Sequence, residues 1–212
     1  MTFTWVAHPR HLLVLLFLGG AIGFQAQAQS PDKLKVLMAD PPARAAAAEA
    51  GRRASSFCAN CHGPDGNSTL PEVPNLAAQN PVYLLNQMQK FSTGERKNQW
   101  MEPAIKLLSE SERMNIVVYY ATRQVTPVRS ATANDAGRGL YQRVCTRCHG
   151  AGAQGDERYP RLAGQQTVYL VRALTDYRNR TGDRMAPEML AMTAALKDAD
   201  IKAVADYLSS LP

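Results

Sequence analysis

The chain lacks most of the features that mark membrane, β-rich, nucleic-acid-binding or catalytic proteins. The one apolar run near the N-terminus is too short for a membrane-spanning helix, which needs about 20 apolar residues, and no later segment is apolar enough to cross a bilayer, so stable membrane insertion is not expected. No stretch alternates polar and apolar residues for long enough to favour a sheet. No basic stripe is interleaved with aromatic residues, which argues against nucleic acid as a partner, and no acid and base side chains converge as in an enzyme. Only four cysteines are present, and they carry the functional signal.

The N-terminus has the pattern of a secretory signal peptide. A weakly basic start around Arg10 precedes a short apolar run from Leu12 to Phe24, and Ala26-Gln27-Ala28 fits the small-x-small cleavage rule. We therefore expect residues 1–28 to be removed by cleavage after Ala28, leaving a protein located in the periplasm. An uncleaved membrane anchor is the alternative. Cleavage lowers the formal net charge by one from +6, which leaves a modestly basic protein.

All four cysteines belong to two copies of the pattern C-x-x-C-H. The copies are Cys58-Ala59-Asn60-Cys61-His62 and Cys145-Thr146-Arg147-Cys148-His149. This pattern is the attachment signature of c-type haem, in which two thiols form thioethers with one porphyrin and the histidine binds its iron. The alternatives are a zinc site, a thioredoxin-like dithiol or two disulfides. The histidine that follows directly in both copies favours two covalent haem groups.

The sequence around the two motifs is repeated. Pro74-Asn75-Leu76-Ala77 recurs as Pro160-Arg161-Leu162-Ala163, and Val82-Tyr83-Leu84 recurs as Val168-Tyr169-Leu170. Each repeat spans roughly 80–90 residues. A domain of that size has a marginal apolar core, and a buried porphyrin would enlarge the core. We expect this organisation: an N-terminal arm at 29–43, a first domain at 44–123, a linker at 124–135 and a second domain at 136–212.

Helix signals occur throughout, which predicts an all-α fold. Asn80-Pro81 reads as an N-cap followed by proline at the first helical position. Ser109 with Glu112 forms a capping box. Asp198 is expected to cap the last helix. The predicted apolar faces comprise Leu84, Leu85, Met88 and Phe91; Leu170, Val171, Leu174 and Tyr177; Met114, Val117, Val118 and Ala121; and Ile201, Val204, Ala205 and Leu208.

A methionine would close the sixth position of each iron and raise its reduction potential. In the first half Met101 is the best candidate, because Met88 lies on an apolar helical face and Met114 lies inside a capped helix. Met101 precedes Leu108 by seven residues.

The second half offers three methionines. Met189 precedes Leu196 by seven residues and therefore matches the register of the first half. Met185 is the alternative ligand, and Met192 is expected to pack in the core. A ligating histidine usually donates its second ring N–H to a carbonyl. Pro74 and Pro160, in matching loops, are the expected acceptors.

These residues resemble those of the cytochrome c4 family, which are di-haem class I cytochromes c. The resemblance covers nearly all of the mature chain and is carried by residues 58–67, by Pro-Arg-Leu-Ala-Gly-Gln at 160–165, and by the helix ends near Tyr119 and Tyr207. It implies two tandem class I domains packed face to face, each wrapped around one covalent haem. The arm before residue 44 has no clear counterpart in the family and is expected to be mobile or loosely docked.

Three functions are compatible with this pattern. The first is an electron shuttle between periplasmic redox proteins, with a membrane respiratory complex or terminal oxidase as the expected acceptor. The second is an electron-transfer subunit of a periplasmic dehydrogenase complex. The third is a catalytic di-haem peroxidase or a gas sensor, which needs an open iron position. The presence of both Met101 and Met189 argues against the third function.

Overall fold

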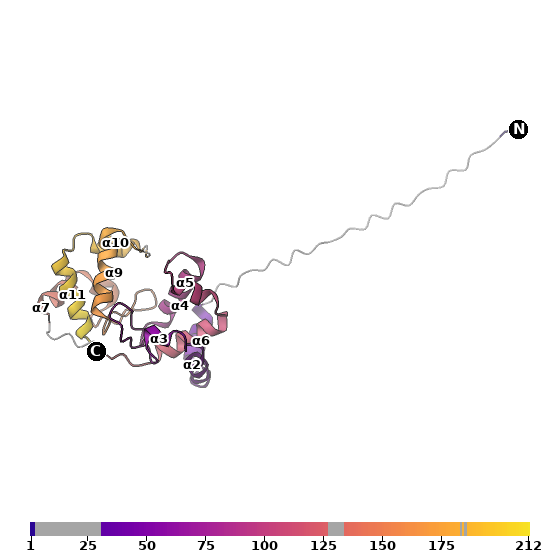
Figure 1. The fold of residues 1–212 in the computed structure, drawn as a ribbon, viewed down its shortest axis with the longest axis horizontal. Coiled ribbons are helices and arrows are strands. Elements are labelled where there is room, and N and C mark those ends of the chain that lie inside the picture. The colour runs from indigo at the N-terminus through magenta and orange to yellow at the C-terminus, as the bar shows by residue number, and fades with distance from the viewer. Residues whose placement is uncertain (3–30, 127–133, 183, 185) are drawn as a thin grey trace.

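Two groups of helices follow one another along the chain (Figure 1). The computed structural model describes residues 1–2, 31–126, 134–182, 184 and 186–212. Residues 3–28 of the expected signal peptide, its cleavage site after Ala28 and linker residues 127–133 lie outside that description. Within the described ranges every regular element is a helix, as the sequence predicts, and none of these helices is long and apolar enough to cross a membrane.

The two groups contain equivalent helices in the same order. The first group holds α1 (Pro31–Ala39), α2 (Pro41–Ala54), α3 (Ala59–His62), α4 (Pro81–Thr93), α5 (Met101–Lys106) and α6 (Glu110–Ala121). The second holds α7 (Asp135–Val144), α8 (Thr146–His149), α9 (Thr167–Asn179), α10 (Pro187–Thr193) and α11 (Asp198–Ser210). Helices α2 to α6 correspond to α7 to α11, and among the helices of the described residues only α1 lacks a counterpart.

Each group is built on one close helix crossing, α2 against α6 and α7 against α11. A glycine lies at each crossing. A Cβ atom on Gly51 would lie 2.0 Å from the carbonyl oxygen of Asn115, and one on Gly137 would lie 2.0 Å from that of Ala203. The backbones can approach this closely only because neither glycine has a side chain.

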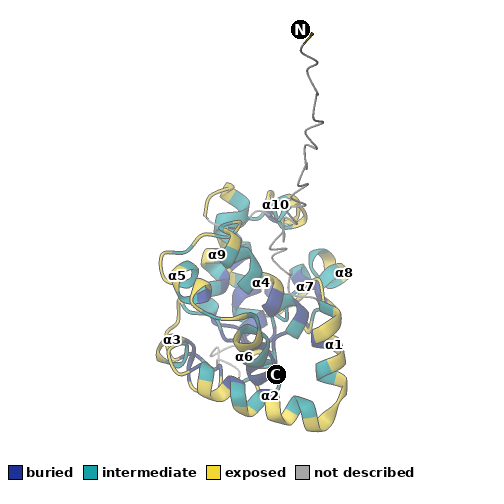
Figure 2. Cartoon of the chain, turned by 90° about the vertical axis from the view of Figure 1, so that its right-hand side faces the viewer, coloured by how far each residue is buried: buried dark blue, intermediate teal, exposed yellow. Residues whose placement is uncertain are grey.

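Most residues of the predicted apolar faces belong to the two cores, and Figure 2 shows where the chain is buried. The first core gathers residues of α1, α2, α4 and α6, and the second gathers residues of α7, α9 and α11. The face expected on the last helix is fully confirmed, because Ile201, Val204, Ala205 and Leu208 are all buried. The other faces are buried or half-buried at every predicted position.

Helix ends follow the sequence signals in part. The capping box is confirmed, since the Ser109 hydroxyl accepts from the Glu112 N–H and the Glu112 carboxylate accepts from the Ser109 N–H. The cap expected from Asp198 is wrong. The helix begins at Asp198 itself, and the Asp200 carboxylate accepts the N–H of Lys197 at 2.9 Å.

The expectation of a mobile or loosely docked arm is also wrong for the described part of residues 29–43. Residues 31–39 form α1, and Leu34 is completely buried in the first core. Lys33 pairs with Glu110 of the first group, whereas Lys35 pairs with Glu157 of the second at 2.8 Å. Helix α1 therefore contacts both groups.

Side-chain amides join the loops of the two groups. Asn80 precedes α4 as predicted, but its side chain does not cap the helix. It donates instead to the carbonyl oxygens of Gln154 and Tyr159 in the second group, at 3.1 and 3.0 Å. The Asn75 amide donates to the carbonyl oxygen of Gly164 at 2.9 Å. These bonds fix the loop after each C-x-x-C-H motif against the opposite group.

Candidate haem sites

Each C-x-x-C-H motif forms one short helical turn. The first cysteine of each motif precedes α3 or α8, and the histidine is the last residue of that helix. Residues three apart in a helix lie on the same face, so both thiols of a motif are presented to the same side. None of the four forms a disulfide: Cys58, Cys61, Cys145 and Cys148.

The thiols do not have the environment of a redox dithiol. Burial raises the pKa of Cys58, and burial together with the neighbouring Cys148 raises the pKa of Cys145 to about 11. Reactive cysteines of thioredoxin-like proteins have lowered pKa values, because the thiolate is the nucleophile. Helical surroundings and the raised pKa values of Cys58 and Cys145 therefore disfavour the thioredoxin alternative.

The two motif histidines are buried and oriented in the same way. Nδ1 of His62 lies 2.9 Å from the carbonyl oxygen of Pro74, and Nδ1 of His149 lies 3.0 Å from that of Pro160. Burial lowers the pKa of both imidazoles, although each carbonyl opposes this, so the neutral form is favoured. A neutral ring that donates from Nδ1 keeps the lone pair of Nε2 for a metal. This donor set fits a haem iron.

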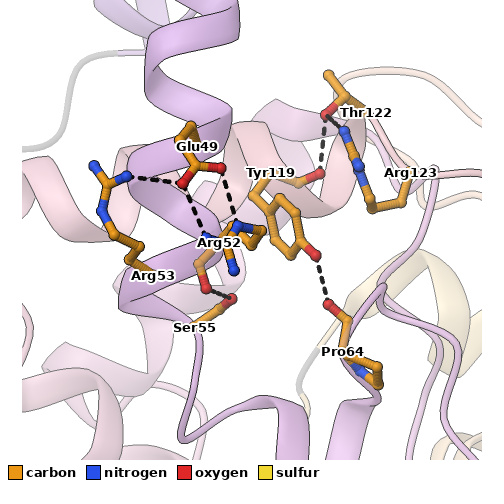
Figure 3. Close-up of polar contacts among 8 residues, drawn as sticks. All are labelled: Glu49, Arg52, Arg53, Ser55, Pro64, Tyr119, Thr122 and Arg123. Atoms are coloured by element: carbon orange, nitrogen blue, oxygen red, sulfur yellow. Dashed lines mark hydrogen bonds and ion pairs between the residues drawn. The ribbon is translucent and has the colours of Figure 1, made fainter.

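Tyrosines support the loops that follow the motifs. The Tyr119 hydroxyl donates to the carbonyl oxygen of Pro64 at 2.6 Å (Figure 3). In the second group the Tyr141 hydroxyl donates to the carbonyl oxygen of Gly150, also at 2.6 Å. Pro64 and Gly150 lie within two residues of the motif histidines. The helix crossings thus hold the chain next to each expected ligand.

Met101 is the first residue of α5, which packs on α4. The Asn98 side chain accepts the N–H groups of Trp100 and Met101, each at 3.0 Å. Glu102 in turn accepts the N–H of Asn98. This local network starts the helix at Met101 and leaves its side chain half-buried.

Met189 lies in α10, which packs on α9 as α5 packs on α4. Pro187 opens the helix, and the Thr193 hydroxyl donates to the carbonyl oxygen of Met189 at 2.7 Å. Met185 lies outside the described residues. The expectation that Met192 packs in the core is wrong, because it is 51% exposed on the outer side of α10.

A cationic cluster between the two groups was not anticipated from the sequence. Arg96 and Arg184 lie beside Tyr169, and Arg184 donates to the Tyr169 hydroxyl. The signal was available, since each arginine stands five residues before its methionine, Met101 or Met189. The repeat of Cys, His, Pro, Gln and apolar positions does not by itself draw attention to this pair of arginines.

Comparisons with known proteins agree with this arrangement. The cytochrome c family profile matches residues 135–212. Cytochrome c4 of Azotobacter vinelandii is 34% identical over 77% of this chain and 89% of its own. The thiosulfate dehydrogenase electron acceptor of Thiomonas intermedia is 32% identical over 74% of this chain and 80% of its own. The crystal structure of reduced cytochrome c4 from Pseudomonas stutzeri superposes with a TM-score of 0.69 at 30% identity, covering 78% of this chain and 98% of that chain.

Proposed function

This chain belongs to the cytochrome c4 family, and from that premise we propose that it shuttles electrons between respiratory redox partners in the periplasm, toward a terminal oxidase. It is a di-haem electron carrier rather than an enzyme, and its partners are redox proteins. Covalent haem c supplies one-electron iron chemistry. We propose that Cys58 and Cys61 attach one group and that Cys145 and Cys148 attach the other.

The proposed axial pairs are His62 with Met101 and His149 with Met189. The observation that carries this assignment is its repetition. Each histidine is buried with Nδ1 held by a proline carbonyl, and each methionine lies on a short helix packed against the equivalent long helix. The proline carbonyls orient the imidazoles, and both rings are buried. With a methionine as its sixth ligand, neither iron would have an open position for a substrate or gas. The proposed pairs therefore favour an electron carrier over a peroxidase or gas sensor.

The proposed location is the periplasm, reached through the signal peptide at 1–28 with cleavage after Ala28. Its support is the sequence pattern of the N-terminus together with covalent haem attachment. N-terminal sequencing of the exported, haem-loaded protein tests this proposal. A start at Gln29 is the expected result, and a start at Met1 would show an uncleaved anchor.

A second candidate function is to accept electrons from a periplasmic dehydrogenase. Similarity to a thiosulfate dehydrogenase electron acceptor favours this possibility. Stopped-flow reduction by purified thiosulfate dehydrogenase, compared with oxidation by membranes that contain a terminal oxidase, separates the donor side from the acceptor side. Fast, saturable reduction would assign the donor. Oxidation by the membranes would assign the acceptor.

Carbon monoxide binding to the fully reduced protein tests the closed irons. The wild type should show no change in its Soret band. Met101→Ala and Met189→Ala should each open one haem to carbon monoxide, whereas the controls Met185→Ala and Met192→Ala should stay closed. Rapid binding by the wild type would reject the carrier assignment, and binding by Met185→Ala but not Met189→Ala would exchange the proposed ligand.

A further inference from the structure

The segment that carries the second C-x-x-C-H motif is strongly basic. Residues 136–155 include three arginines and no acidic residue. Arg143 stands two residues before Cys145, the first thiol of the motif. Arg147 stands directly before Cys148, the second thiol. Both of these arginines are exposed, so their charges face solvent beside the thiols that we assign to the second haem.

The structure leaves these two charges uncompensated. Neither arginine forms an ion pair among the residues that the structure describes. The carboxylates that flank the segment already have other partners, because Asp135 pairs with Arg138 at 2.7 Å and Asp156 pairs with Arg158 at 3.9 Å. The surface of α7 and α8 next to the motif therefore presents positive charge to whatever approaches it.

The corresponding surface of the first domain does not share this charge. At the repeat offset of the motifs, Ser56 and Asn60 stand in place of the two arginines. The basic residues of α2 are neutralised within their own helix, because Glu49 binds Arg52 at 2.9 Å and Arg53 at 2.8 Å. The first domain builds an equivalent motif without exposed, unpaired arginines. The charges on the second domain are therefore not needed to form a haem site.

The location of the charges suits contact with another protein. In the view of Figure 2, α3 and α8 lie at opposite edges of the molecule, so a partner on α8 leaves the surface around α3 open. Thioether bonds would hold one edge of the porphyrin at α8, close to such a partner. Complementary charge at the rim of an interface accelerates encounter and orients the partner. Arginine binds carboxylates with paired N–H groups, so an acidic surface is the complement of this one.

We propose that the surface of α7 and α8 around Arg143 and Arg147 is the docking site of an acidic redox protein that exchanges electrons with the second haem. This inference rests on the proposed electron-transfer function and adds the chemistry of one partner's surface. The two guanidiniums attract and orient the carboxylates of that partner. One electron passes between the second haem and the partner's redox centre, so one is oxidised as the other is reduced, and no bond or proton is transferred.

Stopped-flow kinetics of the double variant Arg143→Gln with Arg147→Gln tests the site, first with small probes. Ferricyanide is an oxidising anion, and tris(phenanthroline)cobalt(III) is its cationic counterpart. At low ionic strength the variant should transfer electrons to ferricyanide from one of its two haem groups about tenfold more slowly than the wild type, and to the cobalt complex faster. At about 1 M salt, where charges are screened beyond about 3 Å, both differences should disappear.

Protein partners supply the second probe. Reduction by purified thiosulfate dehydrogenase and oxidation by membranes that contain a terminal oxidase are each measured against ionic strength. The reaction with the acidic partner should be slowed in the Gln variant by a similar factor at low salt. Arg143→Lys with Arg147→Lys keeps the charge and should recover most of the lost rate.

The matched control removes two charges from the other domain. Arg52→Gln with Arg53→Gln changes the net charge by the same amount on α2, ahead of the first motif. It should slow neither ferricyanide nor the acidic partner to the same degree. Equal slowing by the two Gln pairs would show that only net charge matters, and it would overturn the docking site.

Reduction potentials, haem content and carbon monoxide binding are measured on the same samples. A loss of rate that persists at high salt with a lowered potential would assign the effect to driving force and would also overturn the site. A wild type that reacts with either protein at a rate that the Gln variant leaves unchanged would reject the site but not the proposed function. A wild type that reacts with ferricyanide but with neither protein would reject the proposed function, and the docking site with it.

Discussion

The side-chain amide of Gln79 pairs with the main chain of Arg161 in the opposite domain. Its oxygen accepts the Arg161 N–H at 2.7 Å, and its nitrogen donates to the Arg161 carbonyl at 2.9 Å. The repeat-equivalent pair does the same in the other direction, because Gln165 accepts the Asn75 N–H at 2.7 Å and donates to the Asn75 carbonyl at 3.0 Å. The two domains are therefore joined by a reciprocal contact with approximate twofold symmetry.

We predict that Gln79→Ala and Gln165→Ala each lower the free energy of unfolding. Each change leaves an N–H and a carbonyl of the opposite domain without a partner, buried at Asn75 and half-buried at Arg161, at a cost of about 1–3 kcal/mol. Urea denaturation followed by circular dichroism measures the loss. Gln142→Ala, on the exposed side of α7, is the matched control and should cost less than about 0.5 kcal/mol. Equal losses in all three variants would show that the reciprocal contact contributes nothing.

We predict that Gly137→Ala destabilises the second domain, because the new Cβ would lie 2.0 Å from the carbonyl oxygen of Ala203. Overpacking of this kind costs about 1–3 kcal/mol or more, because the α7–α11 crossing has to separate. The control lies on the same helix. A Cβ on Gly139 meets only the flexible end of Arg143, at 3.4 Å. Gly139→Ala should therefore gain about 0.5–1 kcal/mol in helix stability. Thermal unfolding of the two variants should shift in opposite directions.

The repeats made much of this fold predictable. Two C-x-x-C-H motifs and matching apolar faces indicated two equivalent helical domains, and the helices appear where those faces lie. The beginning of α11 shows where local sequence signals were insufficient. Asp198 and Asp200 both lie in the first turn of the helix, and either carboxylate is suitable for accepting a main-chain N–H there. In the folded chain it is Asp200 that accepts the N–H of Lys197.

Contacts between the domains could not be derived from local patterns. Asn80 has the sequence of an N-cap, but the opposite domain offers two carbonyl oxygens to its side chain. The docking of α1 was missed for another reason. Leu34, Leu37 and Met38 have helical spacing, but the segment is short and lacks a repeat to confirm it. Its helix is stabilised by a core that the rest of the chain provides.

We predict that Leu34→Ala lowers the free energy of unfolding by about 2–5 kcal/mol, because it leaves a cavity in the first core. Val36→Ala is the control on the same helix, since Val36 is 72% exposed, and it should cost less than about 0.5 kcal/mol. Urea denaturation gives both values. A small loss for Leu34→Ala would mean that α1 is not held by the core in solution.

Alkaline pH should weaken the second domain through Tyr141. Burial raises the pKa of its phenol, which donates to the Gly150 carbonyl and has no exposed surface. The unfolded chain loses the tyrosine proton at about pH 10, whereas the folded protein keeps it, so the unfolded state binds fewer protons above that pH. The stabilisation is therefore complete below about pH 10 and is lost as the pH rises beyond it. By about pH 10.5 the loss should reach about 1 kcal/mol.

Tyr141→Phe separates this effect from the other buried tyrosines, which titrate in both proteins. At pH 8 the variant should be less stable than the wild type by about 1 kcal/mol, because the Gly150 carbonyl loses its donor. Between pH 8 and about pH 10.5 the variant should lose less stability than the wild type, so the two proteins should converge. Urea denaturation at the two pH values measures both differences. Parallel losses would show that Tyr141 deprotonates as easily in the folded protein as in the unfolded chain, contrary to its burial.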